Sequence, residues 1–169
     1  VAPAVRTAWG EDLGLTREQA TVGKMVSALR TIGFDYVFDT DFAADMTIME
    51  EGSELLERLS HKDDYSWPMF TSCCPGWIRF LKHEYPEFTK NLSSAKSPQQ
   101  MFGSIAKTFF AKKLGVDAKK IVCVSIMPCI AKKYEADVPQ VSSASEKDVD
   151  IVLTTREICR MLRSGGLDF

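Results

Sequence analysis

Apolar residues recur at helical spacing in several stretches of the chain. One such stretch follows Thr16 and Gln19, which have capping-box spacing, and continues to Gly33. A second covers residues 43–59. Pro75 and the run Ser97-Pro98-Gln99-Gln100 predict two more helix starts, because serine is a favoured N-cap and proline suits the first helical position.

Short apolar segments between these stretches have the composition of strands. They cover residues 34–38, 67–72, 121–127 and 149–153, and the last two are nearly continuous apolar runs, which is typical of buried parallel strands. Thr154 and Glu157, in capping-box spacing, then begin another helix. Strands that alternate with helices predict an α/β fold with a parallel sheet flanked by helices. The polar segment 139–147 is expected to be an exposed connection.

Composition limits the classes of function. The chain has 169 residues, 45% hydrophobic and 26% charged, which suits one globular domain or a large piece of one. A net charge of −2 and a pI near 5.8 give no basic footprint for nucleic acid or an anionic membrane. The lysine pairs at 112–113 and 119–120 are expected to be solvated. No apolar stretch approaches the roughly 20 residues that span a bilayer. Because the sequence starts without methionine, we expect a fragment.

The cysteines carry the strongest chemical signal. There are five, an odd number at irregular spacing, which argues against a secreted disulfide framework. Cys73 and Cys74 are neighbours, and Cys129 lies downstream; each motif follows a predicted strand, where ligands gather in parallel sheets. Thiolates are soft ligands for iron, but a cubane takes four of them. The pattern therefore predicts half of an iron-sulfur site, with small core residues as the alternative; Cys123 and Cys159 are interpreted as apolar residues of that kind.

Two motifs resemble the first two signatures of the FeFe-hydrogenases. They are Thr71-Ser72-Cys73-Cys74-Pro75-Gly76-Trp77 and Met127-Pro128-Cys129 with Lys132 and Glu135. Residues 47–54, 93–99 and 150–157 resemble the same family, so the likeness covers essentially the whole chain. The resemblance implies one lobe of a two-lobed H-domain, with residues 1–169 as its N-terminal portion. A third, glycine-rich cysteine motif and any upstream ferredoxin-like domains are then expected outside this sequence.

The resemblance also implies a cofactor and an activity. The H-cluster joins a 4Fe-4S cubane to a di-iron unit that carries CO, cyanide and a dithiolate bridge, and it interconverts protons and electrons with molecular hydrogen. Cys74 and Cys129 would be two of the four cubane thiolates. Implied partners are a ferredoxin-like electron carrier, the rest of the hydrogenase polypeptide or subunit, and cluster maturation proteins. Relatives occur in cytoplasm and periplasm, so the compartment stays open, with cytoplasm favoured.

By the same resemblance, Cys73 passes protons between the di-iron unit and the protein. Its relay would continue through Glu51, Ser93 and Glu54, of which the two glutamates are three apart on one helical face. Cofactor-binding roles are implied for a further set: Lys132 and Ser97 at the cyanides, Gln99 near a carbonyl ligand, Met127 against the di-iron unit, and Ala2 and Pro3 on the opposite wall. The alternatives are ordinary ones: surface glutamates, a solvated Lys132, a helix cap at Ser97 and a core-filling Met127.

The alternative belongs to a different class of function. In it, the chain is a non-catalytic relative of the hydrogenases that acts in iron-sulfur protein assembly or in hydrogen or redox sensing. Assembly relatives generally lack the vicinal pair and the relay, and a sensory hydrogenase would alter residues such as Cys73. Both features are present in this sequence, which favours turnover.

Overall fold

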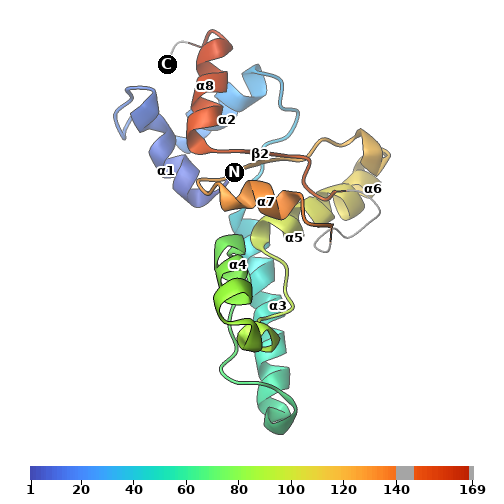
Figure 1. Cartoon of the computed structure of the whole chain (residues 1–169). Coiled ribbons are helices and arrows are strands. Elements are labelled where there is room, and N and C mark those ends of the chain that lie inside the picture. The colour runs from blue at the N-terminus through green and yellow to red at the C-terminus, as the bar shows by residue number, and fades with distance from the viewer. Residues whose placement is uncertain (140–146, 168–169) are drawn as a thin grey trace.

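The computed structural model describes residues 1–139 and 147–167, so most of the predicted connection at 139–147 lies outside the described residues. Helices surround a small sheet at one end of the molecule, and α3 (Asp41–Ser60) and α4 (Pro75–Glu84) extend away from it (Figure 1). We call the first part the body and the second, residues 41–92, the projection. Helix α5 (Pro98–Ile105) lies where the two parts meet and packs against α3.

The sheet confirms the predicted parallel pairing. Strands β1 (Val124–Ile126) and β2 (Ile151–Leu153) pair in parallel, with Ser125 opposite Val152. Helix α7 (Ala131–Ala136) follows β1, and α8 (Thr155–Ser164) follows β2 from the predicted capping box of Thr154 and Glu157. The strands are shorter than predicted. Before β1, the amide of Cys123 donates to the side chain of Asp150 instead of continuing the ladder.

The core of the body lies between the sheet and the helices α1 (Pro3–Asp12), α2 (Val22–Thr31) and α8. Trp9 and Leu29 are almost completely buried there, and the indole nitrogen of Trp9 donates to the carbonyl of Ala20. Cys159 has no exposed surface and packs in this core, which confirms its interpretation as a small apolar residue. One apolar cluster therefore holds the body together.

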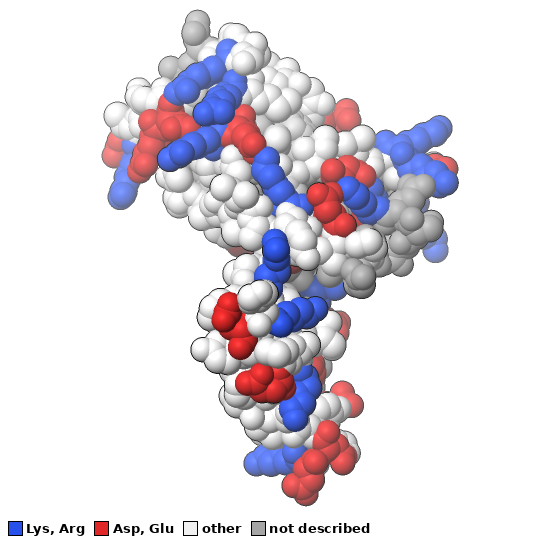
Figure 2. Space-filling view, in the orientation of Figure 1, with Lys and Arg blue, Asp and Glu red and all other residues white. Residues whose placement is uncertain are grey.

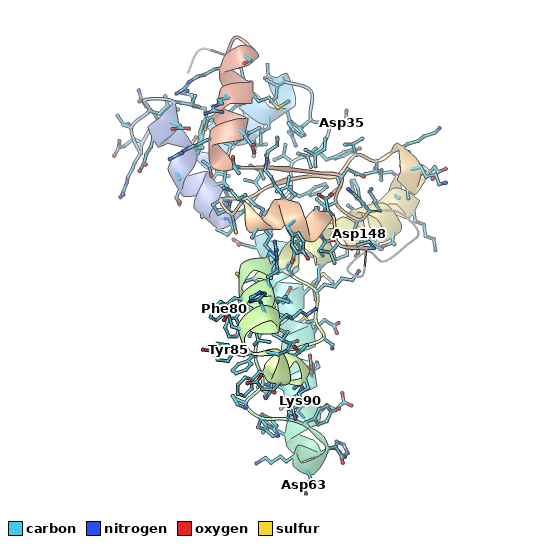
Figure 3. The ribbon with its side chains drawn as sticks, viewed as in Figure 1. Asp35, Asp63, Phe80, Tyr85, Lys90 and Asp148 are labelled. Atoms are coloured by element: carbon cyan, nitrogen blue, oxygen red, sulfur yellow. The ribbon has the colours of Figure 1, made fainter. Side chains whose placement is uncertain are left out.

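The projection has a different construction. Helix α3 confirms the prediction for 43–59, and α4 begins with Pro75 at its first turn, as predicted. Two short 3-10 helices, η1 (Lys62–Asp64) and η2 (Pro86–Asn91), complete it. Aromatic rings pack on its surface, and Phe80 and Tyr85 lie on the same side of the projection with ring centroids 5.9 Å apart (Figure 3).

The segment after α5 stays helical but changes its winding. A π-helix, η3 (Ala106–Phe110), leads into α6 (Ala111–Leu114), which ends at Gly115 with a φ of +67°. A 3-10 turn, η4 (Ala118–Lys120), precedes β1. The lysine pairs at 112–113 and 119–120 are exposed, as predicted. None of the helices among the described residues is both long enough and apolar enough to cross a bilayer.

Three local predictions are wrong. Residues 34–38 form no strand; the rings of Tyr36 and Phe38 pack against Phe110, and the bond from the Val1 amino group to the Phe38 carbonyl does not extend into a ladder. Within 67–72, only Phe70 makes a β-bridge, with Leu92, because Pro68 has no amide hydrogen for a ladder. The reciprocal bonds of Thr16 and Gln19 close a turn, whereas α2 begins at Val22 with Thr21 as its N-cap.

Candidate metal centre

The two cysteine motifs lie at the facing ends of α4 and α7, which pack against each other (Figure 1). Cys74 is the N-cap of α4, where its sulfur accepts a hydrogen bond from the amide of Trp77 at 3.4 Å. Cys129 stands two residues before the first residue of α7. A Cβ placed on Gly76 would lie 3.8 Å from Cys74 Sγ and 3.9 Å from Ala131 Cβ. The first turns of both helices are thus in close contact.

A direct bond joins the two motifs. The ammonium group of Lys132, three residues beyond Cys129, donates to the backbone carbonyl of Cys73 at 2.8 Å. Cys73 and Cys74 are exposed and Cys129 is half-buried, and all three are free thiols. Within the described ranges, no three His, Cys, Asp or Glu side chains gather into a complete metal site. The structure therefore brings the predicted thiols to one region without closing a four-ligand site from this sequence.

Polar groups behind the thiols form a connected network. Lys132 Nζ is 3.0 Å from a carboxylate oxygen of Glu135, and the carboxamide nitrogen of Gln99 donates to the same oxygen at 3.1 Å. Ser125 donates to the carboxamide oxygen of Gln99 at 2.8 Å. Of these four side chains, sequence reasoning assigned roles to Lys132 and Gln99 alone. Their polar groups come from α5, β1 and α7, of which α5 is well separated in the sequence from the other two.

The other predicted cofactor residues lie on elements that border this network. Ser97 is 3% exposed and caps α5 by accepting from the amide of Gln100. Met127 is buried directly after β1. The amide of Ala2 donates to the carbonyl of Ile126 at 3.0 Å, which places the start of α1, including Pro3, beside the end of β1. Three helix N-termini, those of α1, α5 and α7, are thus close to the end of one strand.

Two of the predicted relay residues, Glu51 and Glu54, lie on α3 of the projection, and Ser93 follows directly after the projection. The carboxylate of Glu51 accepts from the amide of Ser72, next to Cys73, at 3.3 Å. Ser93 donates its hydroxyl hydrogen to Glu54 at 2.7 Å. Among the described residues, no hydrogen bond joins Glu51 to Ser93 or to Cys73. The structure brings Glu51 to the cysteine loop and Ser93 to Glu54, and it leaves Glu51 unconnected to Cys73 and to Ser93.

Sequence reasoning missed Arg58, the residue at the far end of this series. Its guanidinium group is bound to Glu54 through two nitrogens, at 2.9 and 2.5 Å, and also donates to the carbonyl of Leu92. Arg58 is 4% exposed. The i,i+4 spacing of Glu54 and Arg58 was the available signal. Burial would raise the pKa of Glu54, but hydrogen bonds from Ser93, Arg58 and Ser94 outweigh it and hold that pKa below its ordinary value.

Cys123 lies outside this region; it is half-buried and directly precedes β1. Burial, followed by the nearby Asp150 carboxylate, raises the pKa of its thiol to about 11. The thiol is therefore protonated at neutral pH. This agrees with the interpretation of Cys123 as a structural residue, because a metal ligand must be a thiolate.

Comparison with known proteins identifies the family. The model of the family described as "Iron only hydrogenase large subunit, C-terminal domain" matches residues 1–169. The NADP-reducing hydrogenase subunit HndD of Solidesulfovibrio fructosivorans is 54% identical over 99% of this chain and 29% of its own length. A structure of a variant apo [FeFe]-hydrogenase HydA1 from Chlamydomonas reinhardtii superposes with a TM-score of 0.92 at 46% identity, covering 99% of this chain and 42% of that chain.

A more distant relative belongs to the other functional class. The cytosolic Fe-S cluster assembly factor narfl of Xenopus tropicalis is 37% identical over 88% of this chain and 32% of its own length. The chain spans less than half the length of each of these relatives. The family description places the match in the C-terminal domain of the large subunit, and it does not support the narrower expectation of that domain's N-terminal part. The chain belongs to the iron-only hydrogenase large-subunit family, with its matching region in the C-terminal domain.

Proposed function

We propose that this chain forms the part of an FeFe-hydrogenase catalytic domain that supplies two cubane thiolates, Cys74 and Cys129, and the proton-carrying thiol of Cys73. The whole enzyme would interconvert protons and electrons with molecular hydrogen. The observation that carries this proposal is the 2.8 Å bond from the Lys132 ammonium to the Cys73 carbonyl, because it joins the two cysteine motifs at one place.

The chemistry of the residues fits the H-cluster. Two accessible thiols offer the soft ligands that iron prefers. The Lys132 ammonium and the capped N-terminus of α5 at Ser97 favour anionic ligands such as cyanide. Buried Met127 presents an apolar surface beside them. When bound, the H-cluster supplies the redox chemistry and the place where hydrogen is formed or consumed.

The chain's own contribution is to hold the cluster and to move protons. Cys73 would exchange a proton with the bound cofactor, and Glu51, Ser93 and Glu54 would carry it between Cys73 and the surface of the projection. Because the pKa of Glu54 is lowered, its carboxylate is ionised at neutral pH and is free to accept a proton. Water molecules between Cys73 and Glu51 and between Glu51 and Ser93 are the simplest groups that would complete the series.

The remaining two thiolates are proposed to come from a third cysteine motif in the part of the polypeptide that follows residues 1–169, which would make this chain the N-terminal portion of the domain. A ferredoxin-like carrier or accessory clusters would deliver electrons, and maturation proteins would insert the di-iron unit. A role in iron-sulfur assembly is the second candidate, supported by the assembly factor at 37% identity. The vicinal cysteine pair and the Ser93–Glu54 bond at 2.7 Å favour turnover.

Three variants of the full-length protein test the proposal. Cys73→Ala should keep its iron and the infrared bands of the cofactor, while hydrogen turnover falls about 100-fold or more, as expected for loss of a proton donor. Cys74→Ala and Cys129→Ala should each lose iron, because a cubane ligand is removed.

Cys123→Ala is the control, because this half-buried cysteine lies outside the metal centre; its iron content and activity should match the wild type. Full turnover in Cys73→Ala would reject the proton role. Normal iron loading in either ligand variant would reject the ligand assignment. Cluster binding by the wild type without any hydrogen turnover would favour the assembly role.

A further inference from the structure

Glu135 is a buried carboxylate at the centre of the network behind the cysteines. Only 5% of its surface is exposed, although glutamate is seldom buried without partners. One of its carboxylate oxygens accepts from the Lys132 ammonium at 3.0 Å and from the Gln99 carboxamide at 3.1 Å. Its backbone carbonyl accepts from the side chain of Gln100 at 3.3 Å. A single residue thus holds α7 against the first turn of α5.

The bonds around Glu135 determine the direction of the Gln99 carboxamide. The nitrogen of that carboxamide donates to Glu135 and to the backbone carbonyl of Lys132, both at 3.1 Å. Its oxygen accepts from the Ser125 hydroxyl at 2.8 Å. Both ends of the carboxamide are therefore engaged, and a rotation that exchanges them would place two acceptors together at Glu135. Without the Glu135 carboxylate, this orientation loses one of its three contacts.

The same oxygen also places the Lys132 ammonium. Lys132 and Glu135 are three residues apart on α7, and their side chains are 12% and 7% exposed. This burial distinguishes the pair from the neighbouring Lys133–Glu157 pair, whose side chains are 40% and 38% exposed. Removing one partner of a buried pair leaves the other charge without compensation, so a contact of this kind constrains position strongly. The ammonium held in this way is the group that donates to the Cys73 carbonyl.

We propose that Glu135 is a positioning residue that holds the Lys132 ammonium and the Gln99 carboxamide toward the cofactor and, through Lys132, holds the backbone of Cys73. The inference rests on the proposed function for the identity of that cofactor. The contacts themselves belong to this chain. Glu135→Gln keeps the size of the side chain and removes its charge, so Lys132 loses its ionic partner while the packing of α7 is kept.

The first measurement uses the full-length protein loaded with the H-cluster. We expect Glu135→Gln to retain its iron but to shift at least one cyanide band in the infrared spectrum, because the ammonium near that ligand is no longer held. Glu84→Gln is the matched control: Glu84 is an exposed glutamate at the end of α4, and its variant should show the wild-type bands. Wild-type bands in Glu135→Gln would overturn the proposal.

The second measurement uses the cluster-free full-length protein and does not depend on the cofactor. In a Cys74→Ser background, so that the peptide covering 73–74 contains one thiol, the rate at which iodoacetamide alkylates Cys73 is followed by mass spectrometry. We expect a several-fold faster rate with Glu135→Gln, because the Lys132 bond to the Cys73 carbonyl is weakened. An unchanged rate would contradict the proposed link. If Glu135→Gln does not fold, Glu135→Asp, which keeps the charge and is one methylene shorter, replaces it in both measurements.

The infrared and alkylation measurements together distinguish a failure of the proposed function from a failure of the proposed role of Glu135. A wild-type protein that takes up no H-cluster would reject the proposed function, while the alkylation arm would still decide whether Glu135 positions the Cys73 loop. Normal cluster uptake and turnover with no effect of Glu135→Gln in either arm would reject the role of Glu135 alone.

Discussion

The body and the projection are stabilised in different ways. The buried apolar cluster lies in the body, where Trp9 and Leu29 are at most 1% exposed. On α3 of the projection, by contrast, Ile48, Met49 and Leu56 are 66–71% exposed. Large uncharged areas lie between the charged groups of the projection (Figure 2). Within the projection, aromatic rings such as Phe80 and Tyr85 pack together near α4, whereas polar contacts join α3 to the loop at 91–97 and to the start of α5. The body therefore has a buried apolar core, whereas α3 of the projection is held to its neighbours mainly by polar contacts.

This difference matches the two parts of the proposed chemistry. The proposed relay uses polar side chains on the projection, where an ion pair and hydroxyl groups determine the geometry. The proposed cofactor pocket lies at the border, where α4 meets α7 and the network behind Lys132 begins. A proton path requires polar groups in sequence, whereas a cofactor pocket requires a rigid wall. Each part of the molecule offers the environment that its proposed role needs.

The largest expected effect comes from comparing a leucine-to-alanine substitution in the body with one in the projection. Leu29→Ala removes a fully buried side chain of the body and should lower the free energy of unfolding by about 2–5 kcal/mol. Leu56→Ala on α3 should change it by no more than about 0.5 kcal/mol, since this side chain is 66% exposed. Urea denaturation of the chain measures both. Equal losses would show that the two parts do not differ in packing.

The next test removes the buried arginine of the projection. Arg58→Met deletes the charged hydrogen bonds to Glu54 and the bond to the Leu92 carbonyl, and should cost about 1.5–3 kcal/mol. Hydrogen exchange should show this loss in residues 41–92 before it appears in the body. Arg58→Lys keeps the charge but not the planar, forked guanidinium group, so its stability should lie between those of the wild type and Arg58→Met. A loss distributed evenly over the molecule would contradict the separation of the two parts.

A smaller effect is expected from pH. The folded pKa of Glu54 lies below its ordinary value of 4.5, so the stability that this carboxylate contributes is complete above pH 4.5 and is lost as the pH falls through the folded value. Glu54→Gln should therefore be less stable than the wild type at pH 7, by about 1 kcal/mol. The difference in stability between Glu54→Gln and the wild type should become smaller below pH 4.5, because the wild-type carboxylate is then increasingly protonated. Glu50→Gln, an exposed neighbour on α3, is the control, and an equal pH dependence for both variants would contradict the role of Glu54.

The smallest effect concerns the sulfur that caps α4. Thiol sulfur is a weak acceptor, so Cys74→Ser should leave the cluster-free chain equally stable or stabilise it by about 0.5 kcal/mol, because serine is a strong N-cap. In the body, Thr154→Ala should cost about 0.5–2 kcal/mol through loss of its capping box. Thermal denaturation compares the two. A marked loss of stability in Cys74→Ser would show that the sulfur has a structural role of its own.

Much of the fold follows from short-range signals. Serine at 97, proline at 75 and 98, and the Thr154–Glu157 capping box marked helix starts that the structure confirms. The segments 34–38 and 67–72 have strand composition, yet they make at most one bridge. Strand formation requires a partner backbone, and composition does not supply one. For the candidate site, the cysteine motifs and the i,i+4 spacing of Glu54 and Arg58 were visible in the sequence, whereas the contacts of Glu135 with Gln99 and Gln100 were not.

The sequence alone determined the helix starts, the family resemblance and the types of side chain that the proposed site contains. These depend on neighbouring residues, because a cap, a first-turn proline or a cysteine pair acts within one turn of the chain. Only the tertiary structure decided that the Lys132 ammonium reaches the Cys73 carbonyl, that Glu135 is buried beneath it, and that Arg58 ends the series on the projection. The contacts of Lys132 with Cys73 and of Gln99 with Glu135 join residues tens of positions apart, so the packing of α4, α5 and α7 sets them rather than any local pattern.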